Sequence, residues 1–207
     1  MGWFIFSKEG IGEMRRLLLA VAIGFLGACA ADTSKSTLNQ QPLPADPQPA
    51  AAALKDGLAA HYYGASYNSV DEFVSWMDYR EGYDGPPLNG LEHRAGKGNV
   101  LTSGSKNQVG ALITGFLLIP EAGSYQLSVT TNDGVRIHLG GARIHNDPKV
   151  GPDRTVESAA FQITQAGWYP LKIWYFENRG TSTLEVLWMT PQSSSFKSIP
   201  TADFKHL

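Results

Sequence analysis

The sequence is poor in cysteine and has almost no excess of charge, and both shortages exclude classes of protein. Cys29 is the single cysteine among 207 residues, so no disulfide can form within the chain. The formal net charge is −2, with 17 Lys+Arg against 19 Asp+Glu. A nucleic-acid-binding domain needs a basic surface and a high isoelectric point. We therefore expect no nucleic-acid partner.

Long helical patterns and catalytic motifs are also missing. No window of about ten residues repeats its apolar positions at a clean helical spacing; the segment VDEFVSWM, Val70–Met77, predicts one short helix. The chain contains neither a Gly-Xaa-Ser-Xaa-Gly nor a His-Glu-Xaa-Xaa-His motif, which serine hydrolases and zinc proteases would show. We therefore do not expect an enzyme.

Alternating strands and glycine-containing turns are abundant instead. Apolar and polar residues alternate with a period of two in 125–131, 135–139 and 184–188, and the segment LKIWYF, 171–176, is apolar on both faces apart from Lys172. Alternation indicates half-buried strands, and a run that is apolar on both faces is typical of a central strand. Turn sequences such as PEAGS, NDG, LGG and QAG separate these strands. The pattern predicts an all-β fold, an antiparallel β-sandwich.

The N-terminus has the features of an export signal. Arg15 and Arg16 precede an apolar run, Leu17–Leu26, which is too short to span a bilayer and leads to small residues. Leu26-Gly27-Ala28-Cys29 resembles the lipobox of bacterial lipoproteins, in which the cysteine is lipidated. We expect residues 1–28 to be a signal peptide whose true start is Met14, and Cys29 to be the lipidation site.

The next segment reads as a linker. Residues 29–54 are rich in Ser, Gln, Pro and Ala and contain few core-forming residues, so they predict a semi-extended tether. The folded domain is expected at 55–207. Lipidation implies that the membrane is contacted through the anchor alone, and Ala30 after the cysteine resembles the sorting signal for the outer membrane.

Six short motifs in order resemble the PA-14-type domain, the β-sandwich named after the anthrax protective antigen. They are GLAAHYYG from Gly57, ALITGFLLIPEAGSYQLSV from Ala111, NDGVRIHLGG from Asn132, GWYPLKIWYFE from Gly167, LEVLW from Leu184, and Ile199-Pro200. The resemblance covers Gly57 to about His206. Residues 77–107 match the family pattern least.

The resemblance also implies a site. In the sugar-binding branch of the family, two consecutive Asp joined by a cis peptide bind Ca²⁺, and a later loop adds an Asn. Here Asn132 replaces the first Asp, Asp133 keeps the second place, and Glu177 falls at the later position. The implied calcium ligands are Asn132, Asp133 and Glu177, and the implied contacts to a sugar are Asn132, Asp133, Asn178 and Arg179.

Two interpretations of the Asn132–Gly134 segment remain open from the sequence. It can form a tight hairpin turn and nothing more, because Asn and Gly tolerate positive φ. Alternatively, it can carry a calcium-dependent site for a glycan or a cell-envelope polysaccharide. The first hypothesis for function is therefore a lectin-like or adhesin-like module, exported and lipid-anchored at the cell envelope. The alternative is a structural or protein-interaction lipoprotein with no metal or sugar site.

Overall fold

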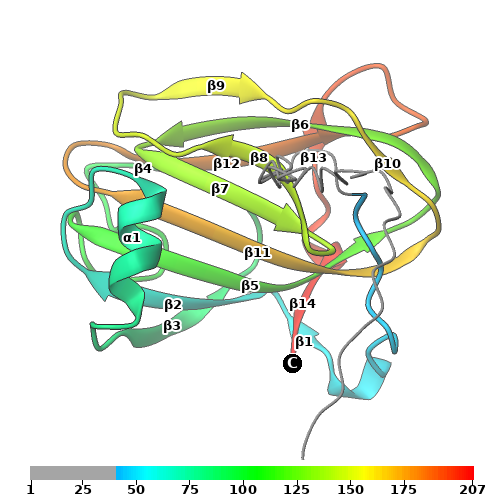
Figure 1. Cartoon of the computed structure of the whole chain (residues 1–207), viewed down its shortest axis with the longest axis horizontal. Coiled ribbons are helices and arrows are strands. Elements are labelled where there is room, and N and C mark those ends of the chain that lie inside the picture. The colour runs from blue at the N-terminus through cyan, green and yellow to red at the C-terminus, as the bar shows by residue number, and fades with distance from the viewer. Residues whose placement is uncertain (1–40) are drawn as a thin grey trace, which may run out of the picture. The chain divides into compact units, whose positions relative to one another are not determined.

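The computed structural model describes residues 41–207, which form two antiparallel β-sheets packed face to face (Figure 1). This confirms the predicted β-sandwich. The expected signal peptide and Cys29 lie outside the described residues. Within residues 41–207, no helix is long and apolar enough to cross a membrane.

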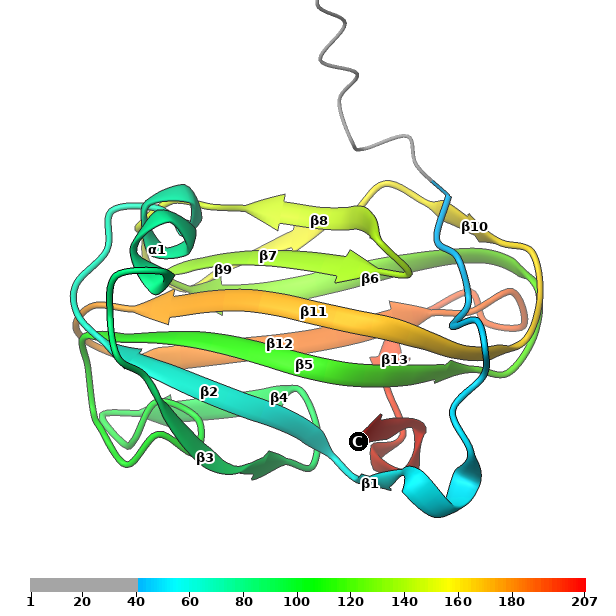
Figure 2. The same cartoon turned by 60° about the horizontal axis from the view of Figure 1, so that its bottom comes forward.

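The larger sheet has eight strands, which Figure 2 shows from β8 through β7, β11 and β5 to β2. At its centre β5 and β11 pair along their whole lengths, from Gly167 opposite Ile119 to Glu177 opposite Val109. The outer face of β11 is less covered than the sequence suggests, because Lys172 is exposed and Trp174 is half-buried. The strands of this sheet are β1 (Lys55–Asp56), β2 (Leu58–Gly64), β3 (Tyr83–Leu88), β5 (Val109–Ile119), β7 (Gly134–Leu139), β8 (Ala142–Asp147), β11 (Gly167–Glu177) and β14 (Phe204–His206).

The smaller sheet has six strands, with β6 and β12 as its central pair. Edge strands β9 and β10 both pair with β6, and β4 and β13 pair with β12. Its strands are β4 (Glu92–Gly96), β6 (Gly123–Asn132), β9 (Arg154–Glu157), β10 (Phe161–Ile163), β12 (Ser182–Met189) and β13 (Lys197–Ser198).

The two similar segments AGSYQLSV and AGWYPLKI begin the long strands β6 and β11, one in each sheet. Both starting glycines, Gly123 and Gly167, have φ of +143°. The tyrosine two residues later donates its hydroxyl to the carbonyl oxygen four residues before it, Tyr125 to Glu121 (3.0 Å) and Tyr169 to Gln165 (2.7 Å). The two segments are therefore structurally equivalent strand entries, as the sequence predicts.

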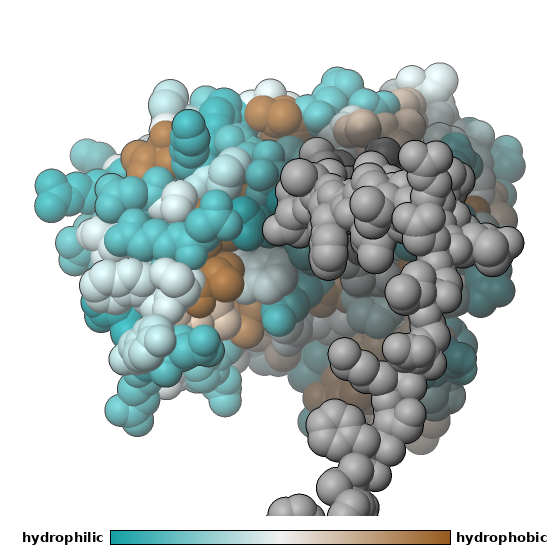
Figure 3. Space-filling model, in the orientation of Figure 1, coloured by the Kyte–Doolittle hydropathy of each residue, from teal (hydrophilic) through white to brown (hydrophobic). Residues whose placement is uncertain are grey.

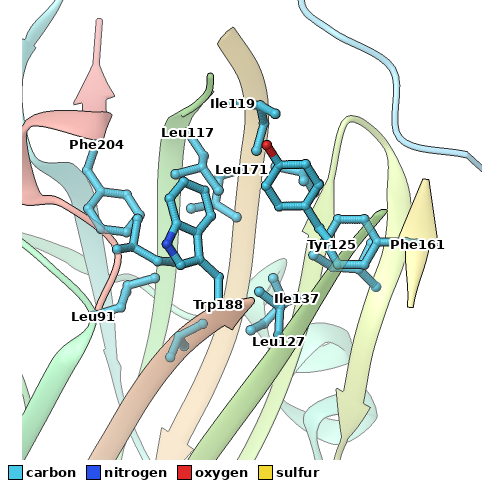
Figure 4. Close-up of a pocket in the computed structure, with 14 residues that line it drawn as sticks. Leu91, Leu117, Ile119, Tyr125, Leu127, Ile137, Phe161, Leu171, Trp188 and Phe204 are labelled. Carbon is cyan, nitrogen blue, oxygen red and sulfur yellow. The ribbon is translucent and has the colours of Figure 1, made fainter. Parts of the chain in front are cut away.

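The core lies between the sheets and is filled by the inward residues of the period-two pattern. Figure 4 shows part of it, where Trp188 of β12 and Tyr125 of β6 meet Leu117 of β5 and Ile137 of β7. A cavity of about 10 Å³ remains among these apolar side chains. A water molecule there would lack polar partners. We interpret this cavity as a packing void and not as a ligand site.

The predicted short helix is confirmed as α1, Val70–Met77. Ser69 caps its N-terminus, because the Ser69 hydroxyl accepts a hydrogen bond from the Glu72 N–H at 3.1 Å. The helix packs through Phe73 against Tyr67 and against Phe176 at the end of β11, in a second apolar cluster outside the main core. This cluster fixes α1 over one end of the sandwich (Figures 1 and 2).

Residues 41–50, which we call the strap, lie against the opposite end of the sandwich (Figure 2). The N–H of Leu43 donates to the carbonyl of Gly140 (3.1 Å), and that of Ala45 donates to the carbonyl of Trp168 (2.8 Å). The Gln48 side chain accepts from the N–H of Trp168 (2.7 Å) and donates to its carbonyl (3.1 Å). Part of the expected linker is thus bonded to the domain, and two short 3₁₀ turns, Ala51–Ala53 and Thr201–Asp203, complete the fold.

Candidate functional site

The Asn132–Asp133–Gly134 segment joins the two sheets. Strand β6 ends at Asn132 in the smaller sheet, and β7 begins at Gly134 in the larger one. The predicted tight hairpin is therefore wrong, because β6 and β7 are not neighbours in either sheet. None of the three residues has a positive φ, and the Asn132–Asp133 peptide bond is cis. We call this segment the corner.

The glycine of the corner is needed for close packing. A β-carbon on Gly134 would lie 2.4 Å from Cε1 of Phe176 and 2.8 Å from the carbonyl oxygen of Pro148. Contacts that short force neighbouring atoms to move. Gly134 therefore lets β11 and the β8–β9 loop approach the corner closely, a role different from the positive φ that the sequence suggests.

One backbone hydrogen bond and one side-chain hydrogen bond hold the corner against the end of β11. The N–H of Asp133 donates to the carbonyl of Phe176 (3.0 Å), and the Tyr175 hydroxyl donates to the carbonyl of Asn132 (2.6 Å). Burial raises the pKa of Tyr175, so this hydroxyl keeps its proton. Residues from two separate loops, β6–β7 and β11–β12, are thus brought together at one end of the sandwich, on the left of Figure 1.

The Asp133 carboxylate lies in this contact and is only 4% exposed. Its Oδ1 accepts a hydrogen bond from the N–H of Gly151 (3.0 Å), and its Oδ2 accepts one from the N–H of Asn178 (2.9 Å). Each carboxylate oxygen has two lone pairs. Asp133 therefore joins three loops and keeps acceptor capacity on both oxygens.

The Glu177 carboxylate is different, because no residue in the described part of the chain donates to it. Glu177 is 0% exposed, and within residues 41–207 neither of its oxygens has a hydrogen-bond partner. Burial, followed by the nearby charges of Asp133 and Asp153, raises the pKa of Glu177 to about 8. An unpaired buried carboxylate is costly, so this group requires either a proton or a cation.

Asp153, in the loop between β8 and β9, is the residue that sequence reasoning missed. Its Oδ1 accepts from the Asn132 side-chain amide (2.9 Å) and from the Thr181 hydroxyl (3.0 Å), and its Oδ2 accepts from the Thr183 hydroxyl (3.0 Å). These bonds, with that from Asn132 the largest cause, lower the pKa of Asp153. The one available signal is its position in the polar loop HNDPKVGPDR, which connects two strands near the corner.

Arg154 holds that loop in place. Its guanidinium donates to the carbonyl oxygens of Asp133 (3.0 Å) and Lys149 (2.8 Å), and it pairs with Asp147 at 2.6 Å. One planar cation thus ties the corner to both ends of the loop. Asp153 is presented next to Asn132 by this arrangement.

Comparison with known proteins identifies the family. A family profile described as PA14 domain matches residues 96–202, which is more than half of the chain. The chain belongs to the PA14 domain family. Among curated proteins, none matches it in sequence.

Solved structures share the fold at low sequence identity. The PA14 domain of the antifreeze protein MpAFP is 19% identical, with a TM-score of 0.64 over 79% of this chain and 96% of that one. A PA14 sugar-binding domain from an RTX adhesin is 18% identical, with a TM-score of 0.59 over 73% and 99%. The A domain of epithelial adhesin 9 from Candida glabrata, solved with Galβ1-3GlcNAc, is 13% identical, with a TM-score of 0.59 over 81% and 97%.

Within this PA14 domain, the residues expected at the site divide into two groups. Asn132, Asp133 and Glu177 lie together and are 7%, 4% and 0% exposed. Asn178 follows them, but its side chain is committed to Tyr67 in the β2–α1 connection: it accepts from the N–H of Tyr67 (2.8 Å) and donates to the carbonyl of the same residue (2.6 Å). Arg179 is exposed on the same loop.

The donor set of the PA14 domain fits a hard cation in its chemistry. Carboxylate and amide oxygens are the ligands that Ca²⁺ prefers. The two carboxylate oxygens of Glu177 have no hydrogen-bond donor within residues 41–207, so a cation could bind them. In the described part of the chain, no three Asp, Glu, His or Cys side chains lie close enough to hold a metal by themselves. Amide, backbone or ligand oxygens would have to complete the coordination shell.

Proposed function

We propose that this PA14 domain is a carbohydrate-binding module held at the cell envelope by a lipid on Cys29. The observation that supports it is the buried, unpaired Glu177 carboxylate beside Asp133, where two loops meet at one end of the sandwich. Related folds include a sugar-binding adhesin domain. The described face in Figure 3 is hydrophilic over much of the end that carries α1, which suits a polar ligand.

In the proposed mechanism Asn132, Asp133 and Glu177 would hold Ca²⁺. The ion would supply a positive centre to which vicinal sugar hydroxyls can bind as oxygen ligands. The backbone N–H groups of Gly151 and Asn178 orient the Asp133 carboxylate. The exposed Arg179 lies at the rim, where its guanidinium can donate to the hydroxyls of a glycan.

Thermal unfolding with and without calcium tests the metal. At about 100 times the Kd, a ligand stabilises the folded state by about 2.7 kcal/mol, which raises the Tm of a domain of this size by roughly 5–10 °C. Asp133→Asn should remove this shift while the domain stays folded. Glu81→Gln, which changes an exposed acid in the α1–β3 connection, is the matched control and should keep the shift. A wild-type Tm unchanged by calcium contradicts the metal site.

A glycan array tests the ligand class, with the wild type and Asp133→Asn each probed with and without EDTA. Binding that disappears in EDTA and in the variant supports the whole proposal. Binding that persists in both supports a carbohydrate module without calcium. No binding to any glycan favours the alternative, a structural or protein-interaction lipoprotein.

The anchor is tested separately by metabolic labelling with palmitate. The wild-type chain should incorporate label into the outer-membrane fraction, and Cys29→Ser should not. Equal label in both proteins would remove the anchor from the proposal and leave the domain unaffected.

A further inference from the structure

Asn132 is an amide placed between two carboxylates, Asp133 next to it in the chain and Asp153 in the β8–β9 loop. The structure shows where the amide nitrogen of Asn132 is directed. It donates to Oδ1 of Asp153 (2.9 Å) and to the Thr181 hydroxyl (3.1 Å), and the Thr181 hydroxyl itself donates to the same Oδ1 of Asp153 (3.0 Å).

These hydrogen bonds require a side chain at position 132 that donates to Asp153. Asp153 needs donors, and Asn132, Thr181 and Thr183 supply them. A carboxylate at 132 would be an acceptor facing an acceptor at about the same distance, and two like charges that close disfavour each other strongly. An Asp at position 132 is therefore incompatible with an ionised Asp153.

The same bonds fix the orientation of the Asn132 amide. Both N–H donors of an amide lie on its nitrogen, and the oxygen lies on the other branch. With the nitrogen committed to Asp153 and Thr181, the side-chain oxygen of Asn132 turns away from Asp153. A reversed amide would put two oxygens in contact and lose both hydrogen bonds.

We propose that Asp153 is a positioning residue of the site: by accepting from the amide nitrogen of Asn132, it fixes this amide with its oxygen directed away from Asp153 and available to a cation. The inference rests on the proposed calcium function for its ligand, but the pairing of positions 132 and 153 holds without metal. The pair needs one amide donor and one carboxylate acceptor. Exchanging the two side chains should therefore preserve the site.

The binding test compares four full-domain proteins: wild type, Asp153→Asn, Asn132→Asp, and the exchanged double variant Asn132→Asp/Asp153→Asn. Affinity for Ca²⁺ is measured by calorimetry, and Tb³⁺ luminescence serves as a second readout. Asp153→Asn should weaken binding by about tenfold or more, as loss of a residue that orients a ligand usually does. The double variant should recover to within about threefold of wild type. Glu157→Gln, which removes an exposed charge on β9, should leave the affinity unchanged.

The folding test uses the same four proteins in EDTA and separates this inference from the calcium proposal. Asn132→Asp should lower the Tm by about 3–6 °C, and adding Asp153→Asn should restore most of the loss. A purely structural role of Asp153 would not produce rescue of calcium affinity by the exchange. The inference is overturned if Asp153→Asn binds calcium as tightly as wild type, or if the double variant is no better than the single variants in both tests. If wild type binds no calcium, the calcium proposal fails, and the EDTA cycle alone decides whether the two positions are coupled.

Discussion

The two ends of strand β11 differ in whether their polar groups have hydrogen-bond partners. At its start, both backbone groups of Trp168 are bonded to the strap, through Ala45 and Gln48. At its finish, Glu177 is fully buried and neither oxygen has a donor within the described chain. Buried polar groups are normally satisfied. The polar groups at the start of β11 are therefore hydrogen-bonded, whereas the carboxylate at its end is not. A buried polar group without a partner is a place where function is expected.

The largest expected effect tests the unsatisfied end. Replacing Glu177 with Gln removes a group whose pKa is raised from 4.5 to about 8. Without metal, the folded protein holds a proton on Glu177 that the unfolded chain releases above pH 4.5. Stability is therefore lost as pH rises from 4.5 to 8, by roughly 3–5 kcal/mol in total. Glu177→Gln should be more stable than wild type by about this amount at pH 8 in EDTA, measured by urea unfolding.

The effect of Glu177 on stability can be separated by pH from the effect of a second buried group, His145. Burial lowers the pKa of His145 from 6.5 to about 4, so the contribution of His145 rises with pH between 4 and 6.5 and opposes that of Glu177 there. Of these two groups, only Glu177 titrates between pH 6.5 and 8. A decline in wild-type stability across pH 6.5–8, absent in Glu177→Gln, is the expected result. An identical profile in both proteins would show that Glu177 is not responsible.

The second effect concerns the packing of the corner. Gly134→Ala places a methyl group 2.4 Å from the Phe176 ring, and overpacking of this kind costs about 1–3 kcal/mol. Because Phe176 belongs to the cluster under α1, hydrogen exchange should speed up in α1 as well as in the corner. Unchanged stability would mean that the corner can move away from β11.

A pair of glycines at the strap end gives a smaller effect and a control. Gly140 and Gly141 form the β7–β8 turn with φ of +52° and +80°, so an alanine at either costs about 1 kcal/mol through backbone strain. Only Gly140 also contacts the strap, where its β-carbon would lie 2.2 Å from the carbonyl oxygen of Leu43. Gly140→Ala should therefore be the more destabilising of the two in urea unfolding. Equal losses would show that the strap bends away easily.

The smallest effect is expected from Gln48→Ala. It removes side-chain hydrogen bonds to Trp168 at an exposed position, so we expect a loss of about 0.5–1 kcal/mol. Calcium affinity should not change, because the strap lies at the other end of β11. Limited proteolysis should cut the variant within residues 41–50 sooner than the wild type.

The sequence predicts local features of this fold well and long-range ones less well. The α1 helix and the strands flanking the corner follow from residue periodicity, since each is specified by its own side chains. The prediction of a hairpin at Asn132–Gly134 is wrong because alternation shows that a strand is present but does not show which sheet the strand joins. The role of Asp153 depends on a loop folding back onto the corner, and no local pattern encodes such an approach.

The attachment of the strap to the domain could not be predicted from the sequence for a related reason. A segment rich in Pro and Ala can still be fixed to a sheet when a single Gln satisfies both backbone groups of one residue, as Gln48 does for Trp168. Composition reports the average tendency of a segment. It does not report one well-placed side chain.

The attachment point of the strap also separates the end where the chain enters the domain from the end that carries the candidate site. The strap meets the sandwich beside Trp168, while Glu177 lies nine residues further along the same strand, about 30 Å away at the usual rise of a β-strand. In the proposed anchored protein, the strap would enter the domain at one end of β11, and Glu177 and the corner would lie at the other end. A glycan bound at the corner would therefore not be obstructed by the strap.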